Sequence, residues 1–250
     1  MSAGGLAGEV HGNGPDILLL HGVGLDRRMW DRVWPELART HRVHLVDLPG
    51  HGGSGPVRRG STLADIAQRV ADAMPAPGHV VGFSLGGLVA QELALDHPEL
   101  VTRLSLVSTV ADRTADQRRA VLARLQAATD DFEASARASV DRWFSAAWHE
   151  REPDLADEVL KVLLSNDRES YLACYEVFAR ADEELWPRLA QISAPTVVVT
   201  GEDDGGSTPA MTRALAAAVP DARAVVVPNT RHLLPLERPQ ELLEVLLRQG

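Results

Sequence analysis

The sequence predicts an α/β fold, a mostly parallel, doubly wound sheet with a helical insertion. Short apolar runs alternate with segments of helical periodicity over residues 1–110. The alternation stops over residues 111–191 and resumes over residues 192–250. Repeated strand–helix–strand units place their strands in parallel, and a long interruption between two strands is typical of an inserted segment. We therefore expect an α/β core of residues 1–110 and 192–250, and a helical cap or lid insertion of residues 111–191.

The elements of the first half follow from apolar runs and helical spacing. Short, wholly apolar runs are typical of strands buried on both faces of a parallel sheet. Ile17–Leu20 is such a run, and largely apolar segments predict further strands at Val43–Val46, Val80–Val81 and Leu104–Val107. Apolar residues at helical spacing between them predict helices at Met29–Leu37, Leu63–Val70 and Leu85–Leu95.

The middle of the chain is charged, rich in alanine and free of any convincing buried strand. Beyond it, strands are expected at Thr196–Thr200 and Ala224–Val227, and helices at Ala210–Val219 and Gln240–Leu247. Eight of the eleven aromatic residues lie in the insertion. They either pack its helices together or form the apolar roof of a pocket. The candidates for a substrate pocket are Trp143, Phe144, Trp148, Tyr175 and Phe178.

Composition narrows the class of protein. A chain of 250 residues with 45% hydrophobic residues suits one globular domain, and no apolar run approaches the roughly 18–20 residues that span a bilayer. The net charge of −10 argues against a nucleic-acid partner. Cys174 is the only cysteine, which excludes an intramolecular disulfide and a metal site built from cysteines. Residues 1–5 show no signal peptide, so a cytoplasmic protein is expected, and the preference for arginine over lysine is typical of a GC-rich bacterial genome.

The most informative motif is Gly82-Phe83-Ser84-Leu85-Gly86-Gly87, between a predicted strand and a predicted helix. A serine flanked by glycines at such a turn is a nucleophile elbow, because its backbone conformation leaves no room for neighbouring side chains. The hydroxyl then stands above the sheet, beside the free N–H groups of a helix N-terminus. Ser84 is therefore the candidate nucleophile.

A candidate acid and base follow the last two strands. Asp204 comes after Thr196–Thr200, and His232 comes after Ala224–Val227. The order serine, acid, histidine is the one expected of such a hydrolase, in which the histidine is the base and the carboxylate orients it. Asp203, the neighbour of Asp204, and Asp112 are the alternative acids.

Two glycine-rich turns need separate interpretations. His21-Gly22-Val23-Gly24 follows the first strand, and we expect the Val23 N–H to act with the Leu85 N–H as an oxyanion hole. The alternative is an ordinary tight turn. Gly50–Gly55 matches the G-x-G-x-x-G pattern, but it leads into Pro56 and not into a helix, so a dinucleotide is not expected. His21 and His51 are expected to shape the backbone of these turns.

These motifs together resemble the α/β-hydrolase superfamily, and within it most closely the 3-oxoadipate enol-lactonases. The resemblance rests on His21-Gly22, on Asp47–Ser54, on the segment around Ser84, on Gly201–Asp204 and on His232. The resemblance extends into two segments of the insertion, Arg142–Ser145 and Tyr171–Tyr175. A serine at the elbow argues against the haloalkane dehalogenases and epoxide hydrolases of this fold, which use an aspartate.

The resemblance also implies details of the site. The insertion would be a small helical cap over the serine, and the fourth position of the Gly-Glu-x-Asp turn, Asp204, would be the acid. The segment after Asp204 is one residue longer than usual, which leaves a shift by one residue open. An enol-lactone substrate is a carboxylate, so a cation is expected in the pocket. The candidates for this cation are Arg27, Arg28, Arg142 and Arg231.

We therefore expect a serine hydrolase that needs no cofactor or metal and cleaves a small ester or lactone through an acyl-enzyme. Its partner would be the small-molecule substrate, with no nucleic acid and no membrane, and the sequence does not predict an oligomeric state. Alternatives that keep the same site are a C–C bond hydrolase of vinylogous diketones, an acyltransferase and a perhydrolase. A hydrolase-fold ligand receptor belongs to a different class, and binding without turnover would distinguish it.

Overall fold

The centre of the computed structural model is a seven-stranded sheet in the order β1-β3-β2-β4-β5-β6-β7. The strands are β1 (Gly8–His11), β2 (Asp16–Leu20), β3 (Arg42–Val46), β4 (Gly78–Phe83), β5 (Val101–Val107), β6 (Thr196–Gly201) and β7 (Ala222–Val227). Strand β1 pairs antiparallel with β3, and all other neighbours are parallel. The predicted fold class is confirmed. The structure describes residues 5–248, so most of the segment that argued against a signal peptide, residues 1–4, lies outside the described residues.

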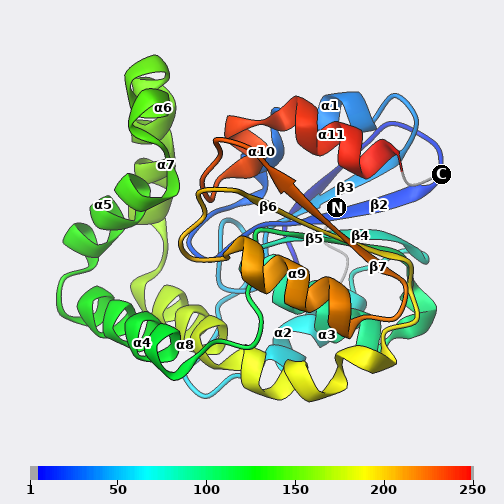
Figure 1. Cartoon of the computed structure of the whole chain (residues 1–250), viewed down its shortest axis with the longest axis horizontal. Coiled ribbons are helices and arrows are strands. Elements are labelled where there is room, and N and C mark those ends of the chain that lie inside the picture. Colours follow the sequence, from blue (N-terminus) through cyan, green and yellow to red (C-terminus); the bar gives the residue numbers. More distant parts are fainter. Residues whose placement is uncertain (1–4, 249–250) are drawn as a thin grey trace.

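Helices cover both faces of the sheet (Figure 1). Helices α1 (Trp34–Leu37) and α11 (Pro239–Leu247) lie on one face, and α2 (Leu63–Ala71), α3 (Leu85–Asp96) and α9 (Pro209–Ala218) lie on the other. Helix α3 has ten buried residues out of twelve, because it packs between the sheet and its neighbouring helices. This burial fixes the start of α3, and therefore Ser84, relative to β4.

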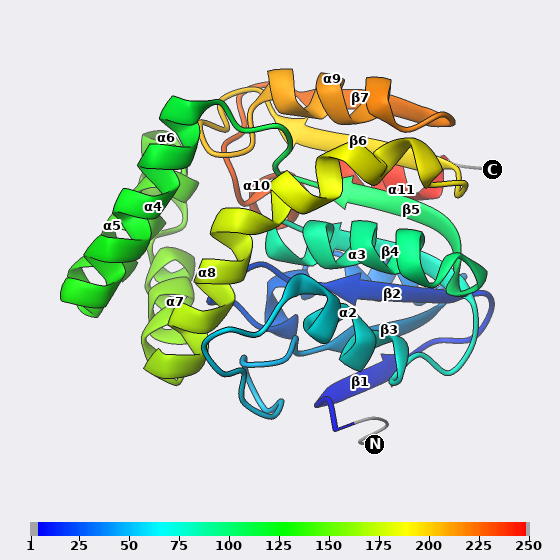
Figure 2. The ribbon, with the colours of Figure 1, turned by 90° about the horizontal axis from the view of Figure 1, so that it is seen from below.

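Five helices between β5 and β6 form a separate group, here called the helical segment. They are α4 (Ala115–Asp130), α5 (Phe132–Trp143), α6 (Ala146–Arg151), α7 (Pro153–Ser165) and α8 (Arg168–Leu185). Four of them begin at a side chain that accepts a backbone N–H, which satisfies a donor left free by the first helical turn. These caps are Thr114, Asp131, Ser145 and Asp167. The helical segment lies beyond the carboxyl ends of the parallel strands (Figure 2).

Short elements complete the chain, and some differ from the sequence prediction. They are η1 (Arg27–Trp30), η2 (Pro98–Leu100), η3 (Trp186–Gln191) and α10 (Leu234–Glu237). The helix predicted over Met29–Leu37 is wrong as one element: it is split into η1 and α1. Pro35 has no N–H to bond four residues back, which explains the break. The edge strand β1 was not predicted, because its half-exposed residues form no apolar run.

None of the helices within residues 5–248 is both long enough and apolar enough to span a bilayer. Over the same residues, no three His, Cys, Asp or Glu side chains gather as metal ligands would.

Candidate active site

Ser84 occupies a sharp turn between β4 and α3. Its φ is 52° and its ψ is −112°, a conformation that an L residue adopts only at a cost. The two flanking glycines make this turn possible. A Cβ on Gly82 would stand 2.2 Å from Gly86 O, and a Cβ on Gly86 would stand 2.5 Å from Leu20 O. The Thr109 hydroxyl donates to Ser84 O at 2.8 Å, which further fixes the turn.

His232 and Asp204 form a buried pair. The distance from His232 Nδ1 to Asp204 Oδ2 is 2.7 Å, and the Asp204 side chain is only 1% exposed. The other carboxylate oxygen, Oδ1, accepts from the N–H groups of Gly206 at 2.8 Å and Ser207 at 2.9 Å. The additional residue after Asp204 therefore belongs to a turn that wraps around its carboxylate. Asp203 is exposed and has no such contact with the imidazole, and Asp112 is also exposed.

The loop that carries His232 is hydrogen-bonded to the helical segment. The His232 N–H donates to Trp143 O at 3.1 Å, at the end of α5. The largely buried Glu237 accepts from Arg231 N at 2.7 Å and from Ser145 N at 3.2 Å, so it joins the two parts of the chain. These bonds hold the imidazole against the aromatic wall of the site, with ring centroids 5.0 Å from Phe83 and 6.0 Å from Trp143.

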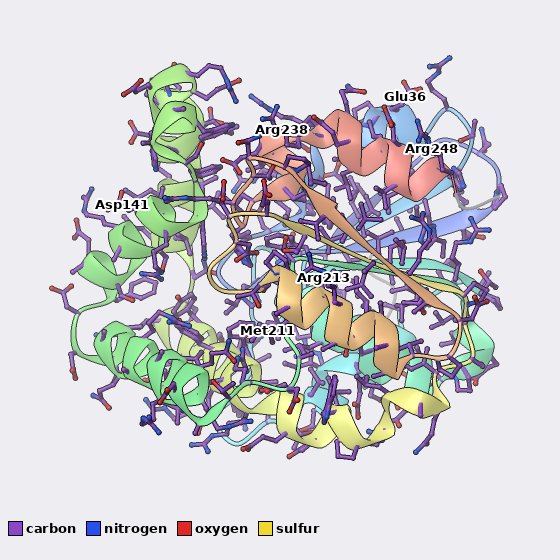
Figure 3. The ribbon with its side chains drawn as sticks, viewed as in Figure 1. Glu36, Asp141, Met211, Arg213, Arg238 and Arg248 are labelled. Carbon is purple, nitrogen blue, oxygen red and sulfur yellow. The ribbon has the colours of Figure 1, made fainter. Side chains whose placement is uncertain are left out.

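Ser84, Asp204 and His232 line one cavity of about 570 Å³ between the core and the helical segment. In Figure 3, the label Asp141 lies on α5 of the helical segment and the label Met211 near the start of α9 in the core. Of the aromatic residues proposed for the pocket, Trp143, Tyr175 and Phe178 line this cavity.

The other two aromatic candidates require a correction. Phe144 and Trp148 are not among the residues that line the cavity. They stack on each other with centroids 3.8 Å apart and are almost fully buried, 0% and 2% exposed. Their role is to pack the start of α6 against its surroundings. Sequence spacing does not separate such a packing pair from a pocket wall.

Two backbone N–H groups near Ser84 are free of protein acceptors among the described residues. Val23 lines the cavity, and Leu85 is the first residue of α3. Among residues 5–248, no protein acceptor takes the N–H of Val23 or of Leu85, whereas the N–H of Gly86 donates to His21 O at 3.0 Å. Two free donors beside a serine hydroxyl suit a developing oxyanion.

The cavity is more cationic than the sequence suggested. Arg142 and Arg231 line it. Arg113, just before α4, and Arg124 on α4 line it too, and sequence reasoning missed both. Arg27 and Arg28 instead pair with carboxylates of the core, Asp47 at 2.5 Å and Asp26 at 2.6 Å. Nothing in the spacing of Arg113 or Arg124 distinguishes them from surface arginines.

These cavity arginines differ in their partners. The Arg113 guanidinium is buried and paired with Asp182 at 2.5 Å. Among the described residues, Arg124 and Arg142 have no carboxylate within 4 Å, and the Arg142 guanidinium donates to Ser139 Oγ at 2.9 Å. Burial lowers the pKa of Arg142, and the nearby positive charge of Arg124 contributes to this. Arg124 and Arg142 therefore bring positive charge to the cavity that no carboxylate within 4 Å neutralises, while Asp203 and Asp204 bring negative charge to the cavity.

Cys174 has the features of an inert core residue. It is fully buried, and burial raises the pKa of its thiol to about 12. A thiol that does not ionise at neutral pH is a poor nucleophile.

A serine at a strained strand–helix turn, a buried histidine–carboxylate pair and free backbone donors on a parallel sheet define a hydrolase of the α/β class. The chain belongs to the alpha/beta hydrolase family, whose model matches residues 17–245.

The similarity to individual relatives extends over almost the whole length of this chain. It is 28% identical to (E)-2-((N-methylformamido)methylene)succinate hydrolase of Acinetobacter baylyi over 240 residues, 94% of this chain and 90% of that protein. It is 33% identical to pimeloyl-[acyl-carrier protein] methyl ester esterase of Chromobacterium violaceum over 246 residues, 95% of each chain. The crystal structure of the enol-lactonase of Burkholderia xenovorans superimposes with a TM-score of 0.90 at 30% identity, over 96% of this chain and 94% of that one. The expected resemblance is confirmed, and these relatives are a succinate-derivative hydrolase, a methyl ester esterase and an enol-lactonase.

Proposed function

We propose that this chain is a serine hydrolase that cleaves small carboxylic esters or lactones without a cofactor, through an acyl-enzyme on Ser84. The observation that carries the proposal is the 2.7 Å pair of His232 and Asp204 in the same cavity as Ser84. The similarity to an enol-lactonase and to a methyl ester esterase supports the same bond class.

In the proposed reaction, Ser84 Oγ attacks the substrate carbonyl while His232 Nε2 takes its proton. The carbonyl π pair moves to oxygen, and the N–H groups of Val23 and Leu85 stabilise that oxyanion. Collapse expels the alcohol oxygen, which takes the proton from His232. A water molecule then loses a proton to His232 and attacks the acyl carbon, and the second collapse releases the acid and expels Ser84 Oγ, which takes the proton back from His232. Asp204 keeps the imidazole in the tautomer that this cycle needs.

We further propose that the helical segment acts as a cap and that the substrate carries a carboxylate. Arg124 and Arg142 line the cavity without carboxylate partners among residues 5–248. A desolvated guanidinium gains most from an anion that completes its hydrogen bonds. A relative that hydrolyses a succinate derivative fits this preference.

The test of the reaction is pH-stat hydrolysis of short esters, γ-lactones and a carboxylate-bearing enol-lactone by the Ser84→Ala variant. We expect a loss of about 10⁶-fold in kcat. Ser108→Ala is the matched control, because Ser108 also follows a strand with a positive φ, 45°, but does not line the cavity. Retention of more than a tenth of the activity by Ser84→Ala would refute the proposal. Two fragments from a vinylogous diketone, acyl transfer to another acceptor, or binding without turnover would instead favour the alternatives.

The test of substrate charge is Arg142→Met. Loss of a charge-assisted hydrogen bond costs about 1.5–3 kcal/mol, so kcat/KM for a carboxylate-bearing ester should fall about 10–100-fold. A neutral ester of the same size should change less than about threefold. Arg137→Met, on the exposed side of the same helix and paired with Glu133, is the control and should affect neither ester. Equal losses on both esters would rule out recognition of the carboxylate by Arg142.

A further inference from the structure

Two buried histidines hold the loop that carries Val23. The His21 side chain is fully buried, and its Nε2 accepts the N–H of Leu48 at 2.8 Å. Because a backbone N–H only donates, the ring proton of neutral His21 lies on Nδ1. That proton is donated to Gly22 O at 2.8 Å, an oxygen that also accepts the Leu25 N–H at 3.2 Å.

His51 makes the same kind of bridge to Gly24, two residues further along the loop. Its Nε2 accepts the N–H of Gly24 at 2.9 Å, and its Nδ1–H donates to Pro49 O at 3.1 Å. The two rings meet edge to face with centroids 5.1 Å apart. Burial lowers the pKa of His21, and burial together with the neighbouring His21 lowers the pKa of His51 to about 3. Both rings are therefore neutral at neutral pH, and both Nε2 atoms are available as acceptors.

These bonds determine where the Val23 N–H points. A trans peptide is planar, so the N–H of Val23 is opposed to the C=O of Gly22. Fixing Gly22 O from the His21 side therefore directs the Val23 N–H away from that oxygen, and Val23 is one of the residues that line the cavity. The backbone oxygen of His21 also accepts the Gly86 N–H at 3.0 Å, which connects this loop to the start of α3.

The helical segment supplies a third contact with the same loop. Asn166, at the end of α7, donates from Nδ2 to Gly24 O at 2.8 Å. The peptide groups on both sides of Val23 are thus fixed through their neighbours, while the Val23 N–H itself is left without a protein acceptor within residues 5–248.

We propose that His21 and His51 are positioning residues: their paired imidazoles fix the peptide groups around Val23 so that its N–H meets the oxyanion of the reaction. This inference rests on the proposed function, in which Val23 is an oxyanion donor. Neither imidazole touches the substrate. Their contribution is confined to the tetrahedral stage, where negative charge develops on the substrate oxygen, so it belongs to kcat and not to ground-state binding.

The test separates the roles of the two ring nitrogens of His51 by replacing the histidine with glutamine or with asparagine. In His51→Gln, the side-chain oxygen can take the place of Nε2 and still accept the Gly24 N–H, whereas the shorter side chain of His51→Asn leaves that donor unmet. Loss of a whole oxyanion donor costs about 10²–10³ in rate, so its misdirection in His51→Asn should lower kcat about 10–100-fold with KM within about threefold. His51→Gln should recover kcat to within about fivefold of the wild type.

A second readout excludes a general packing defect. A trifluoromethyl ketone forms a tetrahedral adduct when Ser84 Oγ adds to its carbon and the π pair moves to oxygen. The product acid, in contrast, binds without forming an oxyanion beside the Val23 N–H. His51→Asn should weaken the ketone about as much as it lowers kcat and leave the product acid unchanged. The control is His79→Asn, since His79 is also buried but bonds to Ser105 Oγ at 2.7 Å, between β4 and β5 and away from the loop. The His79→Asn variant should be less stable than the wild type and have an unchanged kcat.

Equal kcat losses in His51→Asn and His79→Asn, or a His51→Gln as slow as His51→Asn, would overturn the proposal. Should His51→Asn fail to fold, the half-buried Asn166 provides the same test: Asn166→Ala should lower kcat about 3–10-fold at unchanged product affinity, and an unchanged kcat would overturn it. Failure of the proposed function is a different result, namely turnover that survives Ser84→Ala.

Discussion

The assignment of the acid gives the sharpest single prediction, the comparison of Asp204→Asn with Asp203→Asn. The two carboxylate oxygens of Asp204 have different partners. Oδ1 accepts two backbone N–H groups, from Gly206 and Ser207, and Oδ2 faces His232 Nδ1 at 2.7 Å. In Asp204→Asn, the amide oxygen has to occupy the position of Oδ1 and accept the N–H groups of Gly206 and Ser207. The amide NH₂ cannot occupy that position, because it would place a donor against two donors. The NH₂ is therefore directed at the imidazole.

That orientation changes the tautomer of His232. Its Nδ1 becomes the acceptor and its proton moves to Nε2, which then has no lone pair for the Ser84 proton. The same change in a serine protease lowers kcat about 10⁴-fold without altering the geometry, and we expect a loss of that order here. Asp203→Asn should lose less than about threefold, because Asp203 is exposed and does not contact the imidazole.

The assay is kcat on the best ester of the panel, measured by pH-stat at pH 7 to 8, with the unfolding temperature as the control for folding. Asp204→Asn should fold like the wild type. A larger loss in Asp203→Asn than in Asp204→Asn, or an Asp204→Asn variant with a tenth of the wild-type kcat, would refute the reasoning.

Three further predictions concern stability and reactivity. Gly82→Ala brings a Cβ to 2.2 Å from Gly86 O and should cost about 1–3 kcal/mol in urea unfolding, whereas Gly205→Ala, with nothing within 4 Å, should be neutral. His51 and His79 each have a pKa of about 3 in the folded protein, against 6.5 ordinarily, so the unfolded chain binds more protons between these values and stability falls as pH falls. From pH 7 to pH 5 each should cost about 2 kcal/mol, and His79→Gln should flatten the pH dependence; an unchanged slope would contradict this. Cys174, with a thiol pKa of about 12, should resist a thiol reagent at pH 8 until the protein unfolds, and rapid labelling of the native protein would contradict its burial.

Much of the core could be predicted because its signals are local. All residues of β4 are buried and all but His79 are apolar, and the turn at Ser84 needs glycines at fixed positions. Ser84, Asp204 and His232 follow strands β4, β6 and β7, and the structure brings them to one cavity. Their catalytic roles stay predictions that the variants above test.

What the sequence did not predict depends on contacts between distant segments. The choice between Asp203 and Asp204 rests on how the Gly205–Ser207 turn wraps around a carboxylate. Arg124 lies among many arginines of similar spacing, and only the packing of α4 against its neighbours brings it to the cavity. Phe144 was expected at the pocket and instead stacks on a neighbouring indole, because apolar character alone does not tell which cavity a side chain fills.

The central claim is that turnover proceeds through an ester on Ser84, and the most direct test is mass spectrometry of the intact protein quenched during turnover of a slow acyl ester. We predict a mass increase equal to the acyl group, located by peptide mapping on the segment that contains Ser84, and its absence in Ser84→Ala. Full turnover with no acyl adduct on the wild-type protein, or an adduct on another residue, would contradict the account.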